Sequence, residues 1–283
     1  SMLRNYLTIA FRNLRKYRFY SLINITGLTV GMTCFLFIFL YVVDESSFDA
    51  YHSNIDRLYR LNFMARVDDQ LAHLAESPKP AGPTFKDEVP EIEAFCRLQW
   101  QGNVVVRYDN QVFNEDKGMF ADSSLFRVFS FPLLEGDAQT ALVAPNSVVL
   151  SQSVAEKYFG GENPIGKSLK LNDQVCRVTG VMADMPKNTH FQATLFQSLT
   201  SRPEQDEYSN WGDTNTYNYF LLRKDADFNA ASEKISAVFV EKFAAILKAA
   251  FNSSWEDFKK GGDYARVELF PVRDLHLHSK LDG

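Results

Sequence analysis

The most constraining feature of the sequence is a run of 25 residues without a charged side chain, from Phe19 to Val43. As a helix, such a run rises about 37 Å at ~1.5 Å per residue, which exceeds the roughly 30 Å hydrocarbon core of a bilayer. Its second half, CFLFIFLYVV at 34–43, is almost wholly aliphatic and aromatic. The sequence therefore predicts a transmembrane helix over residues 19–43.

The charges on either side of this run are strongly asymmetric. Residues 1–43 hold five basic side chains and no acidic one, so the net charge of −5 for the whole chain leaves −10 on residues 44–283. Because basic flanks stay on the cytoplasmic side of a membrane, we expect the N-terminus in the cytoplasm and residues 44–283 outside it. The acidic excess also argues against nucleic acid as a partner.

A secretory signal peptide is the alternative interpretation, since it too begins basic and then turns apolar. Its apolar region is usually about 7 to 15 residues long and ends at a small-x-small cleavage site. The run in this chain is longer, and YVVDESSFD at 41–49 offers no such site. The pattern therefore favours an uncleaved anchor.

Two further features concern the membrane itself. Residues 1–18 are predicted to form a cytoplasmic amphipathic helix in the interface, although an ordinary basic flank is the simpler alternative. Its apolar side chains share one helical face: Leu3, Tyr6, Leu7, Ala10, Phe11 and Leu14. Inside the span, Gly27 and Gly31 form a GxxxG motif, which would let another helix approach closely. Glycine is common in membrane helices, so the motif alone is weak evidence for a packing face.

Residues 44–283 mix the patterns of strands and helices. Residues 57–67 alternate between apolar and polar side chains, with Arg60 and Asn62 on the polar side, as in a half-buried strand. A long helix is predicted from Asp227, with one apolar stripe formed by Ala231, Ile235, Val238, Phe239, Ile246 and Leu247. The order predicts an α+β fold: an N-terminal transmembrane helix followed by a mixed α/β domain outside the cytoplasm, with an inserted β-rich subdomain at about 112–190.

One segment satisfies the expression for a phosphate-binding loop, GxxxxGK[ST]. Its fixed residues are Gly161, Gly166, Lys167 and Ser168. A phosphate loop needs a buried strand before it and a helix after it, so that backbone N–H groups converge on the phosphates. Here a helix is predicted before the segment and a strand after it. We therefore interpret the match as false and expect no cofactor.

Other candidate chemistry is weaker still. His276 and His278 lie two residues apart and would share one face of a strand, but two ligands do not make a metal site. Structural or surface roles are favoured for all five histidines, which include His52, His73 and His190. Cys96 and Cys176 lie outside the span, where an oxidising compartment would permit a disulfide. No GxSxG, HExxH or CxxC motif is present, so we expect no catalytic site.

Three segments resemble MacB-like or FtsX-like ABC-transporter permeases. The first is the entry, LRNYLTIAFRNLRKYRFYSLINITGLTVGMTCFLFIFLYVVDESSFDAYHSNIDRLYRL at 3–61. The second lies within 118–190 and includes PNSVVLSQSVAEKYFGGENPIGKSLKLND, and the third is VELFPVRDLHLHSKL at 267–281. The resemblance covers over half of the chain in the order of the family, and it implies that the GENPIGKS and HLHS segments are structural elements of a periplasmic core domain.

The resemblance also implies partners. Such permeases work with a cytoplasmic ABC ATPase subunit and with a second permease copy or half, and a periplasmic adaptor is a further candidate partner. The family has more membrane helices after the periplasmic domain, so the chain is expected to be an N-terminal fragment of a longer permease in the bacterial inner membrane. The expected function is a non-catalytic permease part of an export or mechanotransmission complex.

A rival hypothesis belongs to another class of protein. In it, the chain is a single-span membrane sensor whose extracytoplasmic α/β domain binds a small ligand, and the GxxxG face serves receptor dimerisation. An extracytoplasmic enzyme is less favoured, because the sequence shows no catalytic constellation.

Overall fold

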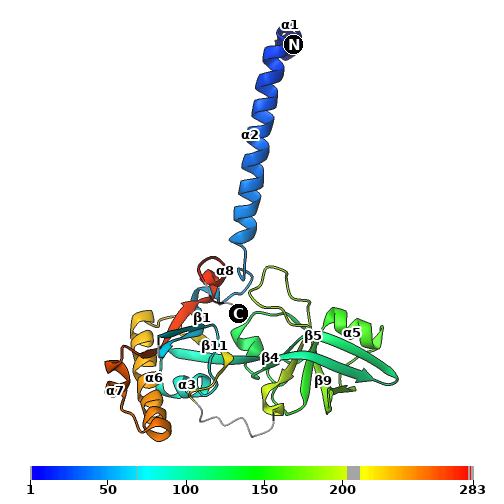
Figure 1. Ribbon diagram of the computed structural model, residues 1–283. Coiled ribbons are helices and arrows are strands. Elements are labelled where there is room, and N and C mark those ends of the chain that lie inside the picture. The colour runs from blue at the N-terminus through cyan, green and yellow to red at the C-terminus, as the bar shows by residue number, and fades with distance from the viewer. Residues whose placement is uncertain (1, 68, 203–210, 280, 282–283) are drawn as a thin grey trace. The chain divides into compact units, whose positions relative to one another are not determined.

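The computed structural model describes residues 2–67, 69–202, 211–279 and 281, and the chain divides into two units, residues 1–47 and 48–283. The first unit contains two helices, α1 (Met2–Lys16) and α2 (Arg18–Glu45) (Figure 1). Helix α2 has 28 residues and a mean hydropathy of 2.1 over its most apolar part. Within the described residues it is the one helix that is long and apolar enough to cross a membrane.

The second unit is built on one mixed sheet, to which twelve strands belong within the described residues. Nine of them follow one another in the order β12-β1-β11-β4-β5-β10-β7-β9-β6, while β2 pairs with β1, β3 with β11, and β8 with both β4 and β9. The ladders β5–β10 and β7–β9 are parallel and the others are antiparallel. The mixed sheet with its helices confirms the predicted fold class.

The strands have the following bounds: β1 (Leu58–Val67), β2 (Gln70–Leu74), β3 (Ser77–Pro78), β4 (Ile92–Tyr108), β5 (Gln111–Ala121), β6 (Leu133–Gly136), β7 (Ser147–Ser151), β8 (Ser168–Leu171), β9 (Gln174–Met182), β10 (Leu195–Ser198), β11 (Thr214–Leu222) and β12 (Tyr264–Pro271). The helices are α3 (Ala81–Glu88), α4 (Leu125–Val128), α5 (Gln152–Phe159), α6 (Phe228–Phe251), α7 (Trp255–Lys260) and α8 (Leu275–His278). Short 3-10 turns occupy Ile55–Arg57, Leu199–Ser201 and Val272–Asp274.

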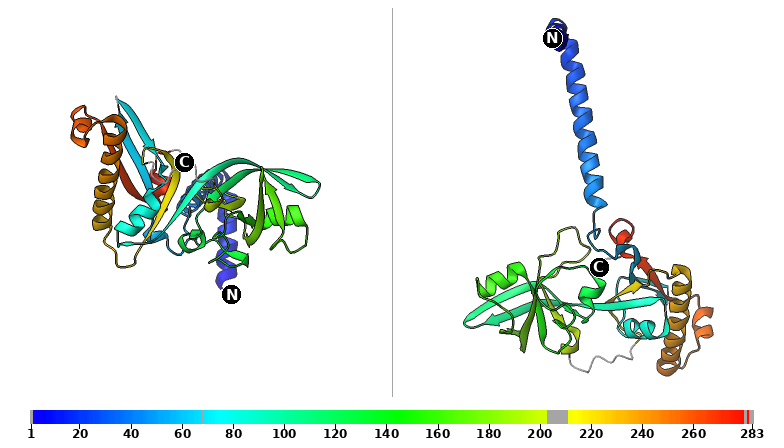
Figure 2. Two further views of the ribbon diagram at one scale, coloured as in Figure 1. Left: turned by 90° about the horizontal axis from the view of Figure 1, so that it is seen from below. Right: turned by 180° about the vertical axis from the view of Figure 1, so that it is seen from behind.

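Helices α3 and α6 cover one face of the sheet at β12, β1, β11 and β4 (Figures 1 and 2). The predicted stripe of α6 is confirmed, since Ala231, Ile235, Phe239 and Leu247 are buried and the other two members are half-buried against the same core. The helix begins after Asp227, whose Oδ1 accepts a hydrogen bond from the backbone N–H of Asn229 at 2.8 Å. Burial of the apolar stripe is the main force that fixes this helix on the sheet.

A second core lies where α5 packs against β7 and β9, and a third lies between the first two. The middle core contains Leu98, Met119, Phe129 and Phe196, and α4 and α8 contribute to it. Strands β4 and β5 run through both halves of the unit, because β4 pairs with β11 near its start and with β5 and β8 near its end. The long β4–β5 hairpin therefore joins the two halves of the sheet.

The polar side of β1 differs from the expectation for a half-buried strand. Leu61, Phe63 and Ala65 face the core under α6 as predicted, but Arg60 and Asn62 on the opposite side are also buried, with exposed fractions of 4% and 1%. The alternation of apolar and polar residues in β1 correctly assigned side chains to the two faces of the strand. It could not show that other parts of the chain shield the polar face from solvent.

Candidate functional site

The residues that follow α2 enter the second unit through a tightly held segment, residues 48–52. The ring of Phe48 stacks on the ring of His276 of α8, with centroids 3.5 Å apart and an interplanar angle of 3°. Asp49 adopts a left-handed backbone conformation with φ of 56°, and its N–H donates to the carbonyl of Asn188 at 2.9 Å. The side chain of Asp49 is thereby turned inward and is only 1% exposed.

A buried line of polar side chains begins at Asp49. Its Oδ2 lies 2.9 Å from Nδ1 of His190, and Nε2 of His190 lies 2.8 Å from the hydroxyl of Tyr219. Burial raises the pKa of Tyr219, so the phenol stays protonated. Because Tyr219 belongs to β11 near the middle of the sheet, this line ties the entry segment to the sheet across the loop that holds His190.

His52 is a second buried histidine of the entry segment. Its Nδ1 accepts a hydrogen bond from the backbone N–H of Ser130 at 3.1 Å, and its Nε2 lies 3.9 Å from Oδ1 of Asp49. Burial lowers the pKa of His52 to about 4; the nearby Asp49 carboxylate partly opposes this shift and His190 adds to it. His52 is therefore neutral near pH 7, when Nδ1 can act as an acceptor.

A pocket of about 420 Å³ adjoins this polar line. Its lining comes from β1, β4, β5, β11 and residues 190–192, and it includes Arg60, Trp100, Lys117, His190, Tyr217 and Tyr219. The register between β1 and β11 brings two of these residues together, because Arg60 of β1 pairs directly with Tyr219 of β11. The pocket therefore lies on the face of the sheet opposite to α6.

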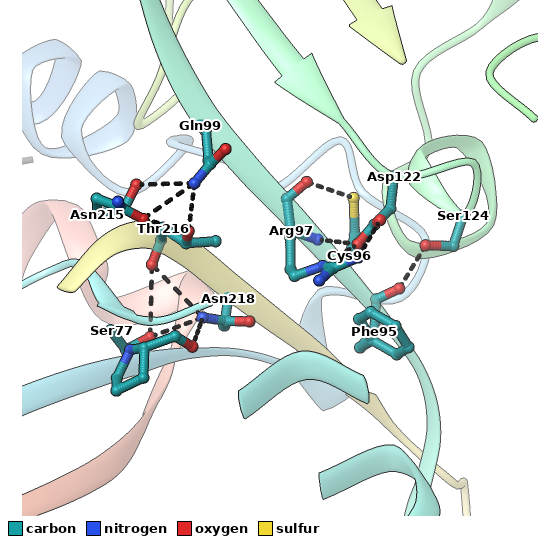
Figure 3. A network of polar contacts seen from close by, with 11 residues as sticks. Ser77, Phe95, Cys96, Arg97, Gln99, Asp122, Ser124, Asn215, Thr216 and Asn218 are labelled. Atoms are coloured by element: carbon teal, nitrogen blue, oxygen red, sulfur yellow. Dashed lines mark hydrogen bonds and ion pairs between the residues drawn. The ribbon is translucent and has the colours of Figure 1, made fainter. Parts of the chain in front are cut away.

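The neighbouring strands are held together by buried polar contacts (Figure 3). Nε2 of Gln99 donates to Oδ1 of Asn215 at 3.0 Å and to Oγ1 of Thr216 at 2.7 Å, which connects β4 to β11. Nδ2 of Asn218 donates to Oγ of Ser77 and to the carbonyl of Pro78, both at 3.0 Å, which connects β11 to β3. These contacts satisfy buried polar groups and fix the strands that line the pocket.

The same figure shows a buried ion pair at the other side of β4. Arg97 binds Asp122 through two side-chain hydrogen bonds, Nε to Oδ2 at 2.8 Å and Nη2 to Oδ1 at 2.9 Å. The adjacent Cys96 is fully buried, and burial raises the pKa of its thiol well above the usual value. Cys96 therefore has the environment of a structural residue and not of a nucleophile.

The segment that matches a phosphate loop forms a turn between α5 and β8, so the predicted order of helix, turn and strand is observed. Lys167 forms an ion pair with Glu162. The N–H groups of Gly166 and Lys167 donate to the carbonyls of Val178 and Pro164, at 2.8 and 3.0 Å. These donors are used within the protein. Our interpretation of Gly161, Gly166, Lys167 and Ser168 as a false match stays a prediction.

The other residues singled out in the sequence do not line the pocket. His276 and His278 belong to helix α8, so the assumption that they share a strand was wrong; no cluster of three or more metal-binding side chains occurs in the described part of the chain. Cys34, Cys96 and Cys176 are all free thiols. Gly27 and Gly31 lie on α2, where an added Cβ would meet no atom within 4 Å, and their packing role stays a prediction.

Sequence reasoning missed the residues that the structure brings together: Asp49, His190, Tyr219, Arg60 and Lys117. They lie far apart in the chain and form no local motif. The one available signal was Arg60 with Asn62 in a strand that is otherwise apolar. A charged residue between apolar neighbours is typical of a surface strand, so the pattern predicted that Arg60 would be exposed to solvent.

Comparisons with known proteins agree with this architecture. The model of the family described as the MacB-like periplasmic core domain matches residues 21–238. A domain of a candidate permease protein from Porphyromonas gingivalis has 21% identity and a TM-score of 0.63, with 78% of this chain and 91% of that chain covered. The periplasmic region of MacB from Actinobacillus actinomycetemcomitans has 15% identity and a TM-score of 0.50, with 79% and 94% covered.

No curated protein sequence matches the chain. The two solved structures are less than 25% identical to it, so they show the shared fold, whereas the family model spans most of the chain. The resemblance noted in the sequence is confirmed: the chain belongs to the family of MacB-like periplasmic core domains, which are parts of ABC-transporter permeases.

Proposed function

We propose that this chain couples ATP hydrolysis by a separate cytoplasmic ABC ATPase subunit to movement of a periplasmic domain. The family is a non-catalytic component of ABC transporters, which favours this function over a single-span sensor. In the proposal, residues 1–18 lie on the cytoplasmic face, residues 19–43 cross the inner membrane and residues 44–283 form the periplasmic core domain, with the region at about 112–190 as a β-rich insertion. A second permease copy or half completes the transporter, and a periplasmic adaptor is a further partner.

The observation that carries the proposal is the anchoring of the entry segment. Only three residues separate the end of α2 at Glu45 from Asp49, whose carboxylate is buried and bound to His190. Leaving a buried polar group without its partner is costly, so this contact resists displacement. A movement of the membrane helix would therefore be passed to His190 and Tyr219 and then to the sheet.

The first test concerns the ATPase partner. The permease that contains this chain is tagged, purified from membranes in mild detergent and analysed for bound proteins and for ATP hydrolysis. We expect a stoichiometric cytoplasmic ATPase subunit and hydrolysis above background. A preparation without any ATPase and without hydrolysis would contradict the proposal and favour the sensor hypothesis.

A further inference from the structure

The pocket on the sheet face opposite α6 has an unusual charge balance. Two of its lining side chains, Arg60 and Lys117, are cationic, and none of the lining residues carries a carboxylate. Two carboxylates lie behind the lining: Asp49 binds His190, and Glu76 is hydrogen-bonded to the hydroxyl of Tyr217. The side chains that line the pocket therefore offer cationic groups to a ligand and no carboxylate.

Arg60 is the more informative of the two cations. It is only 4% exposed, and its hydrogen-bond partners among the described residues are neutral: Nε donates to Oδ1 of Asn62 at 2.9 Å and Nη2 to Oγ of Ser279 at 3.3 Å. Among the described residues, no carboxylate lies within ion-pair distance of Arg60. Buried charges are ordinarily paired with an opposite charge, because removing an ion from water is costly. Within the described part of the chain, the guanidinium thus lacks the anion that such a position usually has.

Lys117 lies on β5 and reaches the same pocket from an exposed position. Its ammonium forms no ion pair within the part of the chain that the structure describes. A flexible lysine beside a buried arginine is a suitable arrangement for an anionic head group, since the arginine offers a planar fork of donors and the lysine a mobile charge.

The remaining walls are largely aromatic and apolar. Trp100, Phe191, Tyr217 and Tyr219 supply rings, and Met119 supplies an apolar base that is only 2% exposed. Trp100 is 49% exposed, which is high for a side chain of its size. A volume of about 420 Å³ lies within the roughly 300–1,000 Å³ of small-molecule sites, which are mostly apolar with a few placed polar groups.

We propose that this pocket binds an amphipathic organic anion, with its carboxylate at Arg60 and Lys117 and its apolar body against Trp100 and the neighbouring rings. A carboxylic acid with a medium-length alkyl chain has this chemistry. The inference goes beyond the coupling function and does not depend on it, because the pocket is built within the second unit alone.

The position of Trp100 allows a direct binding test. The chain, residues 1–283, is placed in nanodiscs of zwitterionic lipid, and tryptophan fluorescence is recorded while 8-bromooctanoate is added. Bromine quenches a tryptophan only at close contact, so we expect saturable quenching that disappears in Trp100→Phe. The other two tryptophans, Trp211 and Trp255, pack in the core under α6 and serve as an internal reference. The alcohol of equal length, 8-bromooctan-1-ol, controls for apolar contact without the charge.

Two substitutions test the head-group contacts. Arg60→Gln removes the charge and retains a donor for Asn62, and we expect it to weaken the binding of 8-bromooctanoate at least tenfold, by loss of a charge-assisted contact. Lys117→Gln changes an exposed side chain and should fold normally, with binding weakened a few-fold. Neither variant should change the binding of the alcohol.

The proposal is overturned by any of three results. These are the absence of saturable quenching up to millimolar 8-bromooctanoate, equal quenching by the acid and the alcohol, or unchanged binding of the acid by Lys117→Gln. Thermal unfolding of each variant verifies that a loss of binding does not reflect a loss of folding. Should Arg60→Gln fail to fold, Lys117→Gln and the acid-to-alcohol comparison still decide the outcome.

Discussion

Asp49 and His52 owe their properties to their surroundings. Asp49 uses a left-handed backbone conformation to turn its carboxylate into the domain, a conformation that aspartate tolerates better than most residues. His52 lies beside it, buried and neutral, and uses Nδ1 as an acceptor. The lowered pKa of His52 makes the folded state sensitive to acid.

We expect His52 to lower the stability of the folded state in mildly acidic solution. In the unfolded chain His52 takes up a proton near pH 6.5, whereas in the folded chain it does so only near pH 4. Between these values the unfolded state binds more protons, so the contribution of His52 is full above about pH 6.5 and is lost as the pH falls towards 4. The loss should reach about 3 kcal/mol at most. Urea unfolding of the chain in neutral detergent, followed by tryptophan fluorescence, measures it.

His52→Asn is the matched variant for this experiment. Asparagine can accept the hydrogen bond from the N–H of Ser130 but does not titrate. The variant should therefore lose less stability than the wild-type chain between pH 6.5 and pH 4. Asp49 and His190 are present in both proteins, so the comparison isolates the effect of replacing His52. Identical pH dependence of the two proteins would show that His52 does not contribute.

At the scale of elements, the sequence predicted the strands and helices that are marked by a pattern of neighbouring residues sustained over several positions. The strand at 57–67 and the helix that starts after Asp227 are both observed, because alternation and capping act over a few residues. The two-residue strand β3 exists only through its pairing with β11, and no local pattern marks it. The short helix α8 is also unmarked, because four residues are too few to show a helical periodicity, and His276 and His278 were therefore wrongly expected on a strand.

The site was less predictable than the fold. Arg60 and Tyr219 meet only because β1 and β11 pair in a particular register, and His190 reaches them from a loop. A register between distant strands is set by tertiary packing and cannot be obtained from one sequence without an alignment. The polar residues in apolar strands were visible, but their burial and their partners were not.

The segment between α2 and the sheet is the element for which we predict a coupling role. Replacing Asp44–Asp49 by a Gly/Ser linker of equal length should leave membrane insertion and ATPase binding intact, but it should uncouple transport. In the purified transporter, the ATP-dependent change in amide hydrogen exchange of residues 183–194 and of β11 should also disappear. The reason is that the linker removes both the Asp49 carboxylate and the Phe48 ring, which hold the segment to the domain.

Single substitutions make the same test sharper. Asp49→Asn removes the carboxylate that contacts His190. Like the linker, it should make the ATP-dependent change in amide hydrogen exchange of residues 183–194 and β11 smaller. Asp69→Asn is the control, because Asp69 has a similar φ of 62° but its carboxylate is exposed. If the linker variant retains full transport and a normal exchange response, the anchored segment does not transmit the movement.

At the scale of the whole molecule, the strongest signal is the separation of charge. Residues 1–43 contain five basic side chains and no acidic one, and the remaining residues carry the acidic excess. On the positive-inside rule, we propose that the two parts lie on opposite sides of the membrane. The family match spans α2 from residue 21 and most of the second unit.

Labelling of introduced cysteines tests this orientation directly. Cys96 and Cys176 are buried and Cys34 lies in α2, so none of the three should react readily with a membrane-impermeant maleimide. In spheroplasts of a bacterial host, we expect Val112→Cys, at the exposed end of the β4–β5 hairpin, to react without lysis. Asn13→Cys on α1 should react only after the membrane is permeabilised. The opposite pattern would place the sheet domain in the cytoplasm, where no periplasmic partner could reach it, and the proposed direction of coupling would have to be abandoned.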